Sequence, residues 1–165
     1  MAVLPRPVIG DHVPPIPEAL TETLGQRLTP LGFSRMPGDV VWKKKTWNVN
    51  RGVALVAHEG RDHPGETARF NKAWFGGMIG FVPALYTLGL QIVIVTRGVL
   101  PWADDLDRYV DQANNFQVVL QNIHVVDLDR REAVSSRTWV QFATGNFYDA
   151  VHEALQRYLA LPPSP

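Results

Sequence analysis

The sequence predicts an α/β (α+β) fold, in which a mixed sheet of about five strands carries helices on one or both faces. Three observations lead to this class. Residues 90–95 (LQIVIV) are a short, β-branched and nearly unbroken apolar run, which is typical of a strand covered on both faces. Apolar residues recur at helical spacing near both ends of the chain. Between these ends, helical and strand-like segments alternate in the order α-β-β-α-β-α-β-β-α.

The expected helices each carry an apolar stripe and boundary residues that suit helix ends. Pro17 fits the first position of the opening helix, and Pro30 stops it. Asp62 or His63 serves as the cap of the second helix, which ends before Pro83. The helices are expected over residues 17–28, 62–82, 104–113 and 146–159.

The expected strands are apolar or alternating segments bounded by turn-forming residues. Residues 48–51 contain such turn formers, so the first two strands form a hairpin. Residues 134–142 alternate apolar and polar side chains, as a half-buried strand does. A helix joins the strands at Leu55 and Ile92, which favours a parallel pair. The strands are expected over residues 40–47, 52–57, 90–95, 116–129 and 133–142.

Length and composition indicate one soluble domain over residues 17–160, with a proline-rich arm at 1–16 and a short tail at 161–165. The chain has 165 residues, no cysteine, and 16 basic against 16 acidic side chains. The missing cysteine excludes disulfides and thiolate metal sites. The missing basic excess argues against general nucleic-acid binding, although Lys43–Lys45 lie between two tryptophans. No signal peptide is recognisable, so the expected location is the cytoplasm.

Residues 73–96 contain no charged side chain, and this uncharged stretch is long enough for a membrane span. Several glycines and one proline interrupt the stretch, and its second half has strand character, so we expect a buried helix followed by a central strand. Three glycines in five positions weaken a helix and need a compensating contact. We therefore expect an exposed apolar patch that binds a protein partner or a second copy of the chain. The candidate interface residues are Trp74, Phe75, Met78 and Phe81.

Residues 58–66 (HEGRDHPGE) are the densest polar group in the sequence, and they follow an expected strand. In α/β sheets ligands gather beyond the carboxyl ends of strands, where further polar side chains from neighbouring strands would join them. Imidazole and carboxylate groups suit a divalent metal such as zinc or manganese, and a glutamate can act as a general base. Asp62 has an alternative role as a helix cap. The candidate catalytic residues are His58, Glu59 and Arg97, and the candidate metal ligands are His58, Asp62, His63 and Asp127.

Specific catalytic motifs are missing from the sequence. No HExxH, nucleophile-elbow, P-loop or dinucleotide pattern occurs. A nuclease of the restriction-endonuclease type needs an acidic residue on one strand and an acid-x-lysine motif on the next. Asp39 lies just before the first expected strand, but the second expected strand carries no acid-x-lysine motif. His124 alternates with apolar neighbours in a strand and is interpreted as a satisfied or exposed histidine, and His152 has no evident partner. The sequence favours a non-catalytic protein-interaction or regulatory module, with a small metal-dependent hydrolase or nuclease-like enzyme using loop 58–66 as the alternative.

Overall fold

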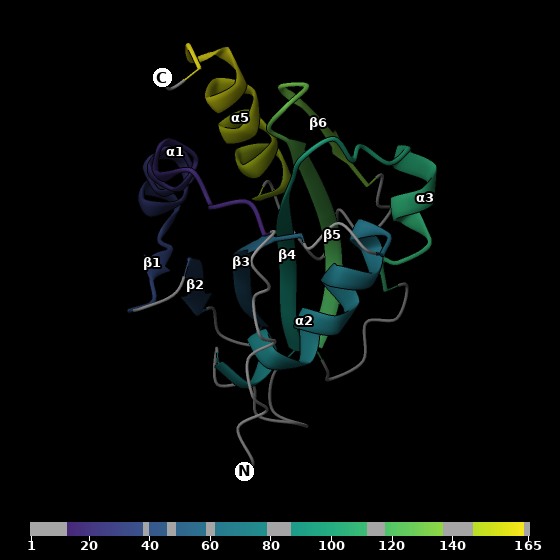
Figure 1. Cartoon of the computed structure of the whole chain (residues 1–165). Coiled ribbons are helices and arrows are strands. Elements are labelled where there is room, and N and C mark those ends of the chain that lie inside the picture. Colours follow the sequence, from purple (N-terminus) through teal and green to yellow (C-terminus); the bar gives the residue numbers. More distant parts are fainter. Residues whose placement is uncertain are drawn as a thin grey trace.

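A six-stranded mixed sheet with helices on both faces forms the protein, which confirms the predicted fold class (Figure 1). The computed structural model describes residues 13–37, 40–45, 49–58, 62–78, 87–111, 118–136 and 147–163. The strands are β1 (Ser34–Arg35), β2 (Val41–Lys45), β3 (Val49–Ala57), β4 (Thr87–Thr96), β5 (Val118–Asp127) and β6 (Glu132–Ser135). The helices are α1 (Glu18–Leu28), the 3-10 turn η1 (Thr29–Leu31), α2 (Pro64–Met78), α3 (Ala103–Asp107) and α5 (Phe147–Ala160).

The strands lie in the sheet in their sequence order, from β1 at one edge to β6 at the other. β1, β2 and β3 form an antiparallel meander, β3, β4 and β5 run parallel, and β6 returns antiparallel to β5. Leu55 lies opposite Val93, so the expected parallel pairing of these two strands is confirmed. The carboxyl ends of three strands therefore meet at one edge of the sheet.

Each face of the sheet has its own hydrophobic core. On one face, α1 and α5 pack against each other and cover Trp42, Val53 and Val95. On the other, α2 and α3 cover Ile92 and Ile123, among others. Both parallel crossovers thus place their helix on the same face. The strand order does not reverse within β3–β4–β5, so this set lacks the switch point at which α/β sheets usually bind ligands.

The charge-free stretch 73–96 is divided between α2 and β4 in the described residues. β4 is buried on both faces from Leu88 to Thr96, as its β-branched pattern predicts. Among the described residues no helix has the length and apolar character that a bilayer crossing requires.

The structure differs from the expected elements at several places. β3 and β4 each begin three residues earlier than expected, at Val49 and Thr87, so part of the expected turn 48–51 belongs to β3. β1 has only two residues, both exposed, and so has no burial period to detect. The expected helix over 104–113 ends at Asp107, because Asp111 leaves the helical path to exchange hydrogen bonds with the backbone of Leu120. β6 covers Glu132–Ser135, and the later part of the expected strand lies outside the described residues.

Candidate functional site

The carboxyl ends of the three parallel strands carry three of the predicted site residues. His58 directly follows β3, and its backbone N–H donates to the carbonyl of Val95 at 2.9 Å. Thr96, the last residue of β4, lies opposite Asp127 at the end of β5. His58, Arg97 and Asp127 thus follow or end three adjacent strands. Glu59 lies outside the described residues.

The two histidines of the 58–66 segment are held by contacts that fix the start of α2. His58 is buried, and its Nδ1 lies 2.8 Å from the hydroxyl of Thr67 on that helix. His63 Nδ1 accepts the backbone N–H of Gly65 at 3.0 Å, and its ring stacks on Tyr109 with centroids 4.8 Å apart. His63 therefore caps the first turn of α2, a role that the sequence offered to Asp62 or His63. Asp62 itself is exposed.

Asp127 is fully buried, and its carboxylate holds the turn between β5 and β6. Its Oδ1 accepts backbone N–H groups from Gly98 at 2.9 Å and Asp129 at 3.0 Å. Its Oδ2 lies 3.8 Å from Nε of Arg130. Arg97 is exposed and pairs with Asp129 instead, at 2.9 Å. Within the described part of the chain, no three His, Asp or Glu side chains are grouped to hold a metal ion.

The predicted interface residues on α2 divide into a core residue and a surface residue. Phe75 is only 3% exposed and packs under the helix, so it is not available to a partner. Trp74 is half-buried, and its ring meets Phe75 edge-on at 4.8 Å. The Met78 side chain and the whole of Phe81 lie outside the described residues. Phe70, one turn before Trp74, is 68% exposed.

A buried polar layer between the sheet and α5 is a feature that sequence reasoning missed. At its centre His124 on β5 is fully buried, with Nδ1 2.7 Å from the hydroxyl of Ser135 and Nε2 3.1 Å from Oε1 of Gln91. Because a carbonyl oxygen only accepts, Nε2 carries the ring proton and Nδ1 accepts from Ser135. These bonds connect β4, β5 and β6.

The surroundings of His124 keep its ring neutral. Burial is the main cause, and the neighbouring His152 the second, of a shift that lowers the pKa of His124 from 6.5 to about 3. The ring of Tyr148 lies 5.3 Å from that of His124, and the ring of His152 stacks on Tyr148 at 6.0 Å. A serine hydroxyl beside an imidazole has the geometry of an activated nucleophile. However, so low a pKa makes the ring a poor base near pH 7, which favours a structural role.

Further amides extend this layer into the sheet. Gln121 and Asn122 are both buried next to a register shift between β4 and β5. A Cβ at Gly89 would lie 2.5 Å from Oε1 of Gln121, so the glycine makes room for that amide. Ser136 accepts the backbone N–H of Ile123 at 3.0 Å. The strand pattern of β5 contained Gln121, Asn122 and His124, but it did not show that α5 packs over His124.

Comparison of the chain with known protein families, curated proteins and solved structures finds no match. Function is therefore inferred from the residues of this chain.

Proposed function

We propose that this protein is a non-catalytic interaction module that associates with a second copy of itself through the outer face of α2. The observation that supports this most directly is the 68% exposure of Phe70 in a helix whose other face is packed on the sheet. Phe70 and Trp74 are four residues apart and therefore lie on neighbouring turns of one helix face. Together they present aromatic surface of the kind that is enriched at interface hot spots.

The charges beside Phe70 suit self-association. Glu66 and Arg69 are both exposed on α2, so the face carries one charge of each sign. In a two-fold dimer the same patch meets itself, and a patch of a single sign would repel its copy. Arg69 is also held in place, because its guanidinium donates to the carbonyl oxygen of Arg108 at 3.0 Å and lies over the ring of Tyr109. The zero net charge of the chain adds little long-range repulsion.

The test is the concentration dependence of molecular mass. Sedimentation velocity or light scattering should detect a dimer on the order of tens of micromolar, and Phe70→Ala should abolish it. Burying one phenylalanine side chain contributes roughly 1.5–3 kcal/mol, and a two-fold interface buries it twice, so dimerisation should weaken about 100-fold or more.

A matched control is available in Trp102, whose side chain is 81% exposed and which precedes α3. Trp102→Ala should leave the dimer intact. A wild-type monomer at these concentrations contradicts the proposal. If Trp102→Ala abolished the dimer and Phe70→Ala did not, the interface would include Trp102 and not the outer face of α2, which would contradict the proposal.

The alternative, a small metal-dependent hydrolase at the strand ends, is supported by one observation. His58 and Asp127 are both buried at the carboxyl ends of β3 and β5, the two parallel strands that flank β4. Zinc or manganese added to the protein should then raise the melting temperature, and His58→Ala should remove that increase. An unchanged melting temperature, with no metal in elemental analysis, would leave only the structural roles of these side chains.

A further inference from the structure

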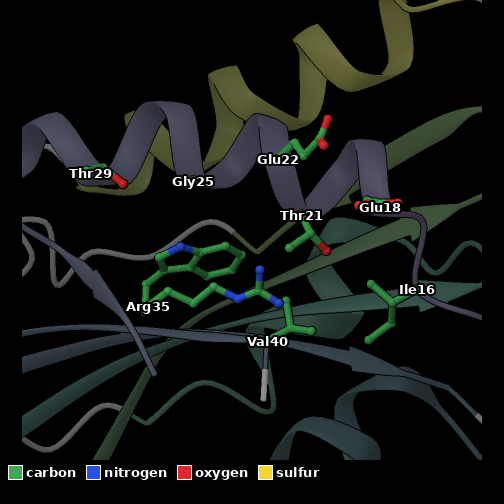
Figure 2. Close-up of a pocket in the computed structure, with 9 residues that line it drawn as sticks. Ile16, Glu18, Thr21, Glu22, Gly25, Thr29, Arg35 and Val40 are labelled. Atoms are coloured by element: carbon green, nitrogen blue, oxygen red, sulfur yellow. The ribbon is translucent and has the colours of Figure 1, made fainter. Parts of the chain in front are cut away.

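A cavity of about 560 Å³ opens between α1 and the β1–β2 edge of the sheet (Figure 2). This volume is in the range of small-molecule sites. The cavity lies on the α1–α5 face of the sheet, opposite the face that α2 covers. Its apolar wall includes Ile16, Val40 and the indole of Trp42.

Three charged side chains line this cavity, and their signs are mixed. Arg35 comes from β1, and Glu18 and Glu22 stand one turn apart on α1. Figure 2 shows the guanidinium of Arg35 pointing toward the space between Thr21 on the helix and Val40 on the sheet side. Among the described residues, these three side chains have no hydrogen bond or ion pair with one another or with any other group.

Nearby basic side chains are engaged by the protein itself. Arg27, also on α1, pairs with Glu153 on α5. Lys44 on β2 donates to the carbonyl oxygen of Leu31 at 2.6 Å. Arg35 differs from both because it extends along the cavity wall with its hydrogen-bond donors available to a bound molecule.

Gly25 keeps the helix side of the cavity open. It lies in the interior of α1, and a Cβ there would lie 3.7 Å from Nε1 of Trp42. Glycine in a helix interior costs about 0.5–1 kcal/mol relative to alanine. Alanine would fit at this position without a clash, so packing alone does not require the glycine. The glycine therefore keeps a Cβ off this part of the cavity lining, where the indole itself is only 1% exposed.

We propose that this cavity binds a small zwitterion, an α-amino acid with an apolar side chain. Arg35 would bind the carboxylate through paired N–H donors, which is the geometry that guanidinium groups favour. Glu18 and Glu22 would attract the ammonium group through their charge from the helix side, although Figure 2 shows the carboxylate of Glu22 pointing away from Arg35. The apolar body would lie against Ile16 and Val40, which are partly exposed in the lining. The charges of the two glutamates would repel a simple anion, and the charge of Arg35 would repel a simple cation. A molecule that carries both charges therefore fits the lining best.

The test is a panel of the twenty amino acids, measured by ligand-observed NMR and calorimetry at up to about 10 mM. At least one apolar amino acid should bind. Its carboxamide, which lacks the carboxylate, should not bind to the wild type. Arg35→Gln should weaken the amino acid about tenfold or more, because a charge-assisted pair of hydrogen bonds is lost. Arg157→Gln, at an exposed position on α5, is the matched control and should bind as the wild type does.

The ammonium contact is tested separately with the N-acetyl derivative of the best ligand. The double variant Glu18→Gln/Glu22→Gln should weaken the free amino acid but not the N-acetyl derivative. Circular dichroism checks that each variant is folded. The proposal is overturned if no amino acid in the panel binds, if Arg35→Gln binds as tightly as the wild type, or if the N-acetyl derivative binds better than the free amino acid.

Discussion

Lowering the pH should destabilise this protein through His124, before most carboxylates are protonated. The ring is buried, neutral and hydrogen-bonded to Gln91 and Ser135 in the folded state. Its pKa is lowered to about 3 by burial and by His152. In the unfolded chain the ring regains an ordinary pKa near 6.5. Between these two values the unfolded state binds more protons than the folded state, so the free energy of unfolding falls as the pH falls.

The size of this effect follows from the shift. Each pH unit within the window contributes about 1.4 kcal/mol, so about 3 kcal/mol should be lost by about pH 4.5 relative to neutral pH. A loss of this size is a large fraction of the stability of a typical domain. At neutral pH the contribution is fully present, because the ring is then uncharged in both states.

Urea unfolding at several pH values measures this slope, with His124→Gln as the variant that cannot titrate. The variant should be less stable at neutral pH, because one amide cannot replace both bonds of the ring, but it should lose less stability on acidification. Carboxylates titrate in both proteins and therefore cancel in the difference. His152→Gln, at an exposed position, should retain most of the wild-type slope, since burial is the larger cause of the shift. Parallel loss of stability in the wild type and His124→Gln would refute a buried neutral histidine.

Three substitutions test the packing of individual elements by denaturant unfolding. Gly25→Ala should stabilise the protein by about 0.5–1 kcal/mol, because alanine favours the helix and meets no clash; a destabilised variant would contradict this. Gly65→Ala should destabilise it by about 1–3 kcal/mol, because the new Cβ would lie 2.1 Å from the ring of Tyr109; unchanged stability would argue against that close packing. Asp127→Ala should cost about 1–3 kcal/mol by leaving the N–H of Gly98 without its acceptor, and a neutral effect would argue against the turn described.

The sequence predicted the sheet well where the pattern is local. The run around Ile92 is buried on both faces, and the order of elements correctly predicted the parallel pairing that places His58 near the end of β4. What the pattern could not supply was the partner of each polar side chain. Thr67, which contacts His58, and Gly98, which binds Asp127, come from other elements, and their approach is decided by tertiary packing.

The rotation of α2 could not be predicted from its sequence. Phe70 and Phe75 are both large and apolar, and the helix also carries a half-buried tryptophan between them. The small side chain of Ala68 and the ring of Phe75 pack on the sheet, which turns Phe70 toward solvent. Similarly, the alternation around His124 indicated that it faced away from Ile123, but only the docking of α5 shows that this second face is also covered.

Self-association and amino-acid binding, the two proposed activities, are expected not to affect each other, because their sites lie on opposite faces of the sheet. The aromatic patch at Phe70 belongs to α2, whereas the cavity at Arg35 lies under α1 on the opposite face. Allosteric coupling requires a ligand to contact two states differently, and the sheet, in which β4 is buried from Leu88 to Thr96, separates these sites. Amino-acid binding should therefore have the same affinity in the monomeric Phe70→Ala variant as in the wild type, and saturating ligand should not change the dimer dissociation constant. A shift in either quantity would show that the sheet transmits a change between its faces, and reciprocity requires the other quantity to shift by the same factor.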